Sequence, residues 1–259
     1  MRRLLSFHAL LVYLFLYLPI LVVVALSFNE SRRGVHFTGF TLKWYQGLFQ
    51  DPRVLEYFAN TLVVALVSTL VSTVLGTLLA LGLVRYRFPG KGFLRYLLYV
   101  PVVVPDVVMG VSLLLLFAFS RELLGFPRLS LLTVLPLHTP SQVECVSRPV
   151  LSRLLLLDPA LEEAARDLGA RGFQTFLHVT LPLAWPGVAA GALLALTLSL
   201  DDFVVTFFTA GPGATTLPLY IYSSVKLGVS PKVHALSSLI VGLSAFFLAL
   251  GYAISRRRL

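Results

Sequence analysis

Residues 58–84 read F-A-N-T-L-V-V-A-L-V-S-T-L-V-S-T-V-L-G-T-L-L-A-L-G-L-V and contain no charged side chain. An α-helix needs roughly 20 apolar residues to cross a hydrocarbon core of about 30 Å. In lipid, a helix has the advantage that it satisfies its backbone N–H and C=O groups within its own segment. This stretch therefore predicts a membrane-spanning helix and places the chain among integral membrane proteins.

Four further stretches meet the same length test, and one more meets it in part. The four are residues 8–27, 96–119, 185–208 and 236–254. Residues 129–151 are apolar at both ends but polar in the middle. We therefore expect an all-α polytopic membrane protein of about six transmembrane helices, forming a single transmembrane domain over residues 1–259.

The composition also indicates that lipid surrounds most of the chain. Hydrophobic residues make up 57% and charged residues 13%, and the mean hydropathy is +0.86, whereas soluble domains carry about a quarter charged residues. The net charge of +9 is spread between the apolar runs. That distribution argues against a nucleic-acid partner and for loop charges that set membrane orientation. The single cysteine, Cys145, excludes an internal disulfide framework and a Cys-based zinc site.

The basic residues predict which way the chain crosses the membrane. Arg85, Arg87, Lys91 and Arg95 lie together between two strongly apolar stretches. Cytoplasmic loops carry an excess of Lys and Arg. With six crossings, this cluster and both ends of the chain fall on the same side, so we expect cytoplasmic N- and C-termini.

An amphipathic segment with helix-boundary signals lies between the fourth and fifth predicted spans. Asp158 followed by Pro159 is typical of a helix start, because Asp caps free N–H groups and proline needs no partner at the first position. Glu162 and Glu163 follow early in the helix, where carboxylates complement its dipole. Gly169 can take the left-handed conformation that ends a helix. The apolar face of this helix consists of Leu161, Ala164, Ala165 and Leu168. Composition alone predicts a pair of amphipathic helices on the bilayer surface.

The spacing in this segment carries a more specific signal. Residues 163–165 (Glu-Ala-Ala), Gly169 and residues 179–182 (Val-Thr-Leu-Pro) resemble the EAA loop of ABC importer permeases at every motif position. The resemblance implies that residues 152–184 form a cytoplasmic coupling loop that docks in a groove of a separate ABC ATPase dimer. The coupling residues that it implies are Glu163, Ala164, Ala165, Gly169, Leu181 and Pro182. The chain has no Walker-type phosphate loop, so we expect ATP hydrolysis on another subunit, and no catalytic residues or cofactor here.

Three carboxylates lie inside predicted spans. Asp201 and Asp202 lie roughly 24 Å along the fifth span at 1.5 Å per residue, and Asp106 lies near the middle of the third. Each costs about 2.5–3.5 kcal/mol in lipid, so such residues usually face a polar cavity or a partner. With Ser199, they predict an acceptor-rich pathway for a cationic substrate. Trp44 in the first outside loop is either an interfacial aromatic or a residue that admits substrate, and we group it with this pathway.

Blander interpretations of these acids are also open. Asp106 follows two prolines, and it can serve to cap the restart of a helix. Asp201 and Asp202 can form an interfacial pair at the outer end of their helix. Neither alternative requires contact with a substrate.

Several other motifs resemble one subfamily of these permeases. They are residues 27–29 (Ser-Phe-Asn), 43–45 (Lys-Trp-Tyr), 85–88 (Arg-Tyr-Arg-Phe), 105–106 (Pro-Asp), 199–208 (Ser-Leu-Asp-Asp-Phe-Val-Val-Thr-Phe-Phe) and 217–223 (Leu-Pro-Leu-Tyr-Ile-Tyr-Ser). Together they resemble the spermidine/putrescine permeases. The resemblance implies a type I ABC importer permease in a bacterial inner membrane, paired with a second homologous permease subunit and supplied with polyamine by an extracytoplasmic binding protein. Permeases for other organic cations, iron or amino-acid-like solutes share part of this pattern.

Residues 136–149 depart from that pattern. They read P-L-H-T-P-S-Q-V-E-C-V-S-R-P, where the family would have an apolar fourth helix. Unpaired backbone groups and charges are costly in lipid. One hypothesis is a broken helix in the pathway, which would place His138 and Glu144 near the substrate. The other is a reading-frame disturbance that ends near Val150.

Two other classes of protein are less consistent with the sequence. A membrane-embedded enzyme using Asp201 and Asp202 as metal ligands or acid/base would need convergent ligands, and only Asp106 is available; no His/Glu metal spacing occurs, so no metal site is expected. An ion channel or ATP-independent carrier would not need the coupling motif.

Overall fold

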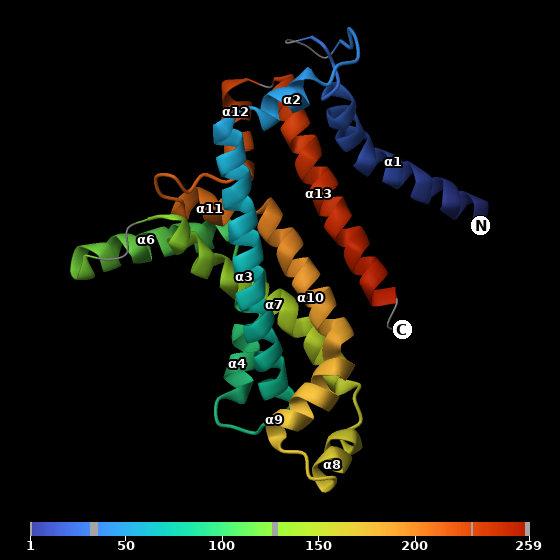
Figure 1. The fold of residues 1–259 in the computed structure, drawn as a ribbon, viewed down its shortest axis with the longest axis vertical. Coiled ribbons are helices and arrows are strands. Elements are labelled where there is room, and N and C mark those ends of the chain that lie inside the picture. The colour runs from blue at the N-terminus through green and yellow to red at the C-terminus, as the bar shows by residue number, and fades with distance from the viewer. Residues whose placement is uncertain (1, 32–35, 126–128, 229, 257–259) are drawn as a thin grey trace. The chain divides into compact units, whose positions relative to one another are not determined.

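The computed structural model describes residues 2–31, 36–125, 129–228 and 230–256, and most of these residues are helical (Figure 1). The helices are α1 (Arg2–Leu26), α2 (Lys43–Phe49), α3 (Pro52–Arg85), α4 (Lys91–Leu97), α5 (Val100–Val103), α6 (Asp106–Leu124), α7 (Leu131–Leu155), α8 (Ala160–Asp167), α9 (Gly172–Thr175), the π-helical turn η1 (Phe176–Thr180), α10 (Leu181–Asp201), α11 (Val204–Thr209), α12 (Leu217–Leu227) and α13 (Pro231–Arg256). In these residues the β-structure amounts to one isolated bridge between Asn29 and Phe40.

Five helical segments in the described part of the chain are long and apolar enough to cross a membrane. They are Arg3–Leu26, Pro52–Arg85, Asp106–Leu124, Gly172–Asp201 and Pro231–Gly251. Each overlaps one of the five strong apolar stretches, so the prediction of an all-α polytopic membrane protein is confirmed. α7 corresponds to the sixth stretch and is long enough, but it is too polar to meet the same test.

Two of the predicted spans are interrupted rather than continuous. In residues 96–119, the short helices α4 and α5 precede α6. Pro105 causes this break, because the residue before a proline avoids the helical region and Val104 is extended with ψ 124°. In residues 185–208, α10 ends at Asp201 and α11 begins at Val204, with two residues between them. The sequence had suggested that Asp106, Asp201 and Asp202 lie inside continuous membrane spans. In the structure they lie instead at the ends of helices or directly beside them.

α7 is continuous, so the hypothesis of a broken helix at residues 136–149 is wrong. It passes through Pro136, Pro140 and Pro149. Hydroxyl groups donate to its carbonyls: Thr139 Oγ1 to Leu135 O at 3.1 Å, and Ser72 Oγ of α3 to Thr139 O at 3.4 Å. Such hydroxyl and neighbour contacts are what allow proline inside membrane helices. The reading-frame hypothesis stays a prediction that resequencing of the gene tests.

The chain divides into two compact units, and each is described by itself. The first consists of Met1–Phe58 and Leu217–Ala245, and the second of Ala59–Thr216 and Phe246–Leu259. A single transmembrane domain over residues 1–259 stays a prediction.

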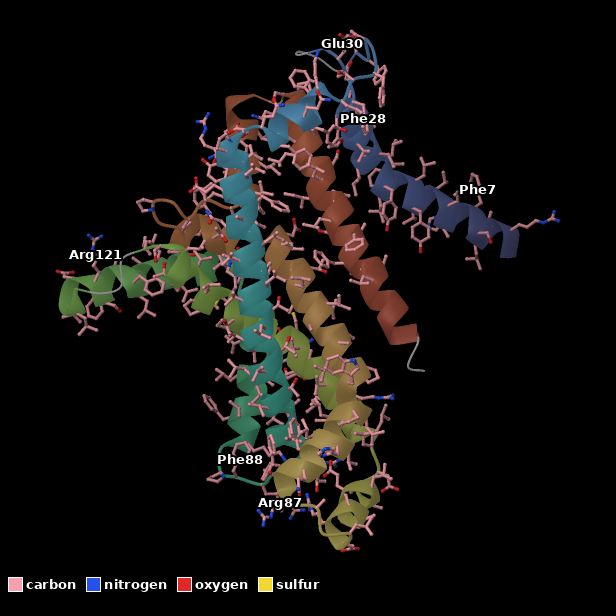
Figure 2. All side chains as sticks on the ribbon, in the orientation of Figure 1. Phe7, Phe28, Glu30, Arg87, Phe88 and Arg121 are labelled. Atoms are coloured by element: carbon pink, nitrogen blue, oxygen red, sulfur yellow. The ribbon has the colours of Figure 1, made fainter. Side chains whose placement is uncertain are left out.

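In the first unit, the motifs at residues 27–29 and 43–45 pack against each other. Trp44 Nε1 donates a hydrogen bond to Asn29 O at 2.7 Å, and Ser27 Oγ is 2.6 Å from the Tyr45 hydroxyl. Asn29 is buried, and its Oδ1 accepts from Thr38 N at 2.9 Å. α1 exposes apolar side chains along its length, as Figure 2 shows for Phe7, which suits a helix surrounded by lipid or by another subunit.

An ion pair outside the apolar core of this unit predicts a pH dependence of stability. Lys232 Nζ donates to Asp51 Oδ2 at 2.7 Å, and this hydrogen bond holds the pKa of Asp51 below its ordinary value although partial burial opposes it. The pair therefore stabilises the fold above the unfolded pKa of about 3.9, and the contribution is lost as pH falls through the lower folded pKa. The unfolding temperature of the parent should exceed that of Asp51→Asn at pH 7, and the difference should shrink below about pH 4. A difference that stays constant with pH contradicts the pairing.

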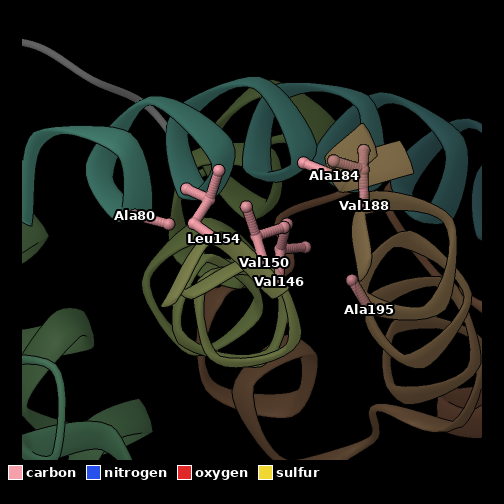
Figure 3. Packing of buried hydrophobic residues seen from close by; sticks show 7 residues of the cluster. All are labelled: Ala80, Val146, Val150, Leu154, Ala184, Val188 and Ala195. Carbon is pink, nitrogen blue, oxygen red and sulfur yellow. The ribbon is translucent and has the colours of Figure 1, made fainter. Parts of the chain in front are cut away.

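The core of the second unit forms where α7 lies between α3 and α10. Its buried apolar residues are Ala80, Val146, Val150, Leu154, Ala184, Val188 and Ala195 (Figure 3). Glycines allow the close approach: a Cβ added at Gly191 would lie 2.8 Å from Val146 Cα, and one at Gly187 would lie 2.8 Å from Pro149 O. α3 approaches α7 just as closely, because a Cβ added at Gly76 of α3 would lie 2.8 Å from Val146 Cβ. Small residues at such crossings are typical of membrane helix packing.

Candidate functional site

A polar cavity of about 340 Å³ lies in the second unit, beside the break between α10 and α11. Its polar lining consists of Asp106, His138, Ser141, Gln142, Glu144, Cys145, Ser199, Asp201 and Asp202. None of the described residues that line it is Lys or Arg. Of the five residues predicted to form the pathway, the cavity brings four together: Asp106, Ser199, Asp201 and Asp202.

The carboxylate of Asp202 is bonded to other residues of this chain. Its Oδ2 accepts from Thr206 N at 3.0 Å and from Thr206 Oγ1 at 2.9 Å, so its carboxylate caps the first turn of α11. His138 Nε2 of α7 is 3.2 Å from the same oxygen. These contacts stabilise the helix break and hold α7 against it.

Asp201 and Asp106 are available to a ligand. Both are exposed residues on the cavity wall, and neither has a hydrogen bond or ion pair to the described residues of the chain. Asp106 lies in the first turn of α6 without capping it, where the helix dipole favours its charge. Asp106 therefore lies at a helix restart, but the interpretation that its side chain caps that restart is wrong.

Gln142 adds a buried acceptor to the same wall. Only 2% of the residue is exposed, and its Nε2 donates to Ser68 Oγ of α3 at 3.0 Å. Its Oε1 has no hydrogen-bond partner among the described residues. A buried carbonyl without a donor costs about 1–3 kcal/mol, so a ligand N–H that reaches it would be favoured. Ser199 Oγ completes this cluster, 3.3 Å from Ser68 Oγ and 3.1 Å from His138 Nδ1.

Glu144 is the fourth carboxylate of the cavity, and a cation already accompanies it. Arg148, one turn further along α7, pairs with Glu144, and the Arg148 guanidinium lies 4.9 Å from the centroid of the Tyr99 ring. Pairing of this kind is how charged groups are tolerated at membrane depth. His138 and Glu144 both line the cavity although α7 is continuous, and their place near a substrate stays a prediction.

The segment that resembles the EAA loop forms α8, α9, η1 and the start of α10. Ala160 N donates to Asp158 Oδ1 at 2.9 Å, so Asp158 caps α8 as predicted. Gly169 has φ 91° and ends α8, with Ala170 N bonded to Ala165 O at 3.0 Å. Leu168 is 90% exposed and Glu163 is also exposed. The face of α8 that includes the Glu-Ala-Ala motif is thus uncovered in this chain.

The remaining predicted residues occupy other places. Leu181 and Pro182 start α10, where Leu181 packs against the core of the second unit. Trp44 belongs to the first unit, where it donates a hydrogen bond to Asn29 O, so its place in the pathway stays a prediction.

Sequence reasoning missed three features of this site. Gln142 was missed because it lies in residues 136–149, which depart from the family pattern. Treating residues 131–155 as one continuous helix would have placed it near His138. Glu162 was noted as a residue of the first turn of its helix, yet it is buried and bonded to Arg85 and Thr180. Gly187 and Gly191 form a Gly-x-x-x-Gly pattern in an apolar helix, which is a recognisable signal for close helix packing.

A polytopic helical protein with a polar cavity and an exposed amphipathic loop is a membrane permease by architecture, and comparison with known proteins specifies the family. Residues 72–259 match the model of the "Binding-protein-dependent transport system inner membrane component" family. The chain is 42% identical over 245 residues to the spermidine/putrescine transport system permease protein PotC of Escherichia coli (strain K12), covering 95% of this chain and 91% of that protein. It is 41% identical over 235 residues to the putrescine transport system permease protein PotI of the same strain, covering 90% and 84%. The chain therefore belongs to the binding-protein-dependent transport family, as a multi-pass inner-membrane permease component and not a catalytic subunit.

Solved structures agree on the fold. A bacterial ABC transporter involved in the import of the acidic polysaccharide alginate matches with a TM-score of 0.75 and 18% identity, covering 99% of this chain and 96% of that one. The MetNI methionine ABC transporter, in an inward-facing conformation, matches with a TM-score of 0.62 and 21% identity, covering 85% and 100%. These matches confirm the type I ABC importer permease architecture.

Proposed function

We propose that this chain is the permease subunit through which an ATP-driven importer moves spermidine or putrescine across the inner membrane. The cavity at the α10–α11 break is the observation that carries the proposal. Among the described residues, its lining combines the carboxylates of Asp106 and Asp201 and the Oε1 of Gln142, none of which has a hydrogen-bond partner there, and includes neither Lys nor Arg. Polyamines are cations rich in N–H donors, so they fit an acceptor-rich, negatively charged wall. The 42% identity to a spermidine/putrescine permease supports the same substrate class.

The partners of the chain follow from this role. A cytoplasmic ABC ATPase dimer docks on α8, where the exposed Glu163 and the small Ala164 and Ala165 permit close approach. A second homologous permease subunit completes the translocation pathway. An extracytoplasmic binding protein delivers the polyamine to the outer side, and ATP-driven closure of the ATPase dimer switches the cavity between the two sides.

In the proposed membrane orientation, both termini of the chain lie in the cytoplasm. The loop that holds Arg87 and Phe88, between α3 and α4, lies at the same end of the second unit as the coupling loop at residues 152–184 (Figure 2), and in the proposed orientation this end faces the cytoplasm. Positive charge in short loops favours the cytoplasmic face. Leu259 at the C-terminus is outside the described residues, so this part of the proposal rests on sequence alone.

Uptake by the assembled transporter tests the proposal. The chain is co-expressed with its neighbouring permease and ATPase genes, placed in vesicles and supplied with the binding protein and radiolabelled spermidine or putrescine. We expect ATP-dependent accumulation of at least one of the two polyamines. Stimulation of ATP hydrolysis by the binding protein without accumulation of either polyamine would discard the substrate class. Failure to associate with any ATPase would overturn the importer role itself.

A further inference from the structure

Glu162 is a buried carboxylate at the base of α8, and the residue is only 7% exposed. Its Oε1 accepts from Arg85 Nε at 3.1 Å and from Thr180 Oγ1 at 2.9 Å. Arg85 is the last residue of α3, and Thr180 is the last residue of η1, directly before α10. One carboxylate oxygen therefore fastens α8 to the cytoplasmic ends of two membrane helices.

The neighbouring carboxylate is arranged in the opposite way. Glu163 is exposed and has no hydrogen bond or ion pair to the described residues of the chain. Leu161 and Leu168, on the apolar face of the same helix, are 48% and 90% exposed. α8 thus presents one face outward to a partner, while Glu162 anchors it inward.

Of the two helices that Glu162 fastens, α10 lines the cavity and α3 contacts residues that line it. α10 runs without a break from Leu181 to Asp201, so its first turn is next to the anchor and its last residue is on the cavity wall. On α3, Ser68 Oγ is 3.3 Å from Ser199 Oγ of α10 and accepts from Gln142 Nε2 of α7. A displacement of α8 applied through Glu162 would therefore move α3 and α10 together, and with them the residues around Asp201.

The turn between α8 and α10 suits such a displacement. η1 is a π-helical turn, and π-helical turns are rare and occur frequently at functional sites. Thr180 is the residue of this turn that bonds to Glu162. A shift of the start of α10 relative to α9 would be accommodated at this π-helical turn.

We propose that Glu162 is the positioning residue that transmits motion of the ATPase-bound α8 to α3 and α10, whereas Glu163 serves the contact with the ATPase. This proposal rests on the proposed function for the existence of an ATPase partner, but not on the identity of the solute. Because free energies of coupling are reciprocal, the same joint should carry the signal of a docked binding protein to the ATPase.

The test compares Glu162→Gln with its matched neighbour Glu163→Gln in the assembled transporter. Glu162→Gln keeps the shape of the side chain but leaves Arg85 without a counter-charge: Arg85 Nη2 lies 3.1 Å from Glu162 Oε1 and has no hydrogen-bond partner among the described residues. We expect ATPase association and basal ATP hydrolysis to stay within about twofold of the parent. Spermidine uptake and the stimulation of hydrolysis by spermidine-loaded binding protein should both fall at least about tenfold, because the charge-assisted hydrogen bonds of Glu162 to Arg85 and Thr180 are lost or weakened. Glu163→Gln should instead weaken ATPase association.

Two further variants show whether the joint acts as a unit. Arg85→Gln alone should uncouple uptake from ATP hydrolysis. Combined with Glu162→Gln it should cause little further loss, because the effects of mutations within one hydrogen-bond network are not additive. Thr180→Val removes one hydroxyl without stranding a charge, so it should fold even if Glu162→Gln does not, and uptake per ATP hydrolysed should fall about two- to fivefold.

Three results separate the possible failures. Uptake per ATP equal to the parent in Glu162→Gln or in a folded Thr180→Val would overturn the role of Glu162. Loss of uptake in strict proportion to loss of assembled complex would reduce Glu162 to a structural residue and also overturn it. If the parent takes up no spermidine but its ATP hydrolysis responds to the binding protein, the proposed substrate class is wrong. The loss or retention of that response in Glu162→Gln then still tests the coupling role of Glu162.

Discussion

The Asp201→Asn variant is expected to lose at least about tenfold in polyamine uptake while its assembly and its unfolding temperature stay those of the parent. Asp201 lies on the cavity wall and has no hydrogen bond or ion pair to the described residues. Its removal therefore strands no partner within the chain. A ligand ammonium bound to it would lose a charge-assisted hydrogen bond of about 1.5–3 kcal/mol, and each 1.4 kcal/mol is a factor of ten in affinity.

Asp202→Asn is the matched control, because it makes the same chemical change one residue away. Asp202 caps α11 through Thr206 and accompanies His138, so its charge supports the fold of the helix break. We expect a lower unfolding temperature and a lower yield of assembled transporter, with uptake per assembled complex less affected than in Asp201→Asn. Asn remains a good helix cap, so the chain should still fold.

The two readouts together decide the assignment. If Asp201→Asn destabilised the protein and Asp202→Asn did not, the division between a ligand carboxylate and a structural carboxylate would be reversed. If both variants transported as the parent does, the α10–α11 break would not be part of the pathway.

The membrane helices could be predicted because their signal is local. A continuous apolar run such as residues 58–84 specifies a spanning helix by length and composition. The interruptions were harder, since mean hydropathy takes no account of where Pro105 or Asp202 ends a helix. Their side-chain chemistry contains that information: Pro105 restricts the residue before it, and Asp202 offers its carboxylate to the N–H groups that follow.

α7 shows why the fourth span could not be judged from its own composition. Its prolines and polar residues indicated a defect, yet the polar face packs against hydroxyl-bearing positions of α3 and α10. Ser68 and Ser199 are ordinary residues of apolar runs until those helices are placed together. The candidate site was therefore only half predictable: the acids were visible as charges in lipid, whereas Gln142 and Glu162 acquire their roles from partners far away in sequence.

The Gly191→Ala variant should cost about 1–3 kcal/mol of stability, the usual price of overpacking a close interface. The added Cβ would lie 2.8 Å from Val146 Cα and 3.0 Å from Val146 O. These are backbone atoms of a buried helix, so they cannot rotate away. Moreover, α3 packs closely against the same residue, because a Cβ added at Gly76 of α3 would lie 2.8 Å from Val146 Cβ. Val146 therefore has no room to move away from α10. The expected result is a lower unfolding temperature and less assembled transporter.

Gly82→Ala is the control within the same unit. It is also a glycine inside a helix, but apart from the adjoining residues of its own helix no atom of the described chain lies within 4 Å of a Cβ added there. Alanine is favoured over glycine in a helix by about 1 kcal/mol, so this variant should be as stable as the parent or more stable. If Gly191→Ala matched Gly82→Ala in stability, α7 and α10 would not approach each other this closely. The positions of His138 and Gln142 on the cavity wall depend on that approach, so the geometry of the proposed pathway would have to be abandoned with it.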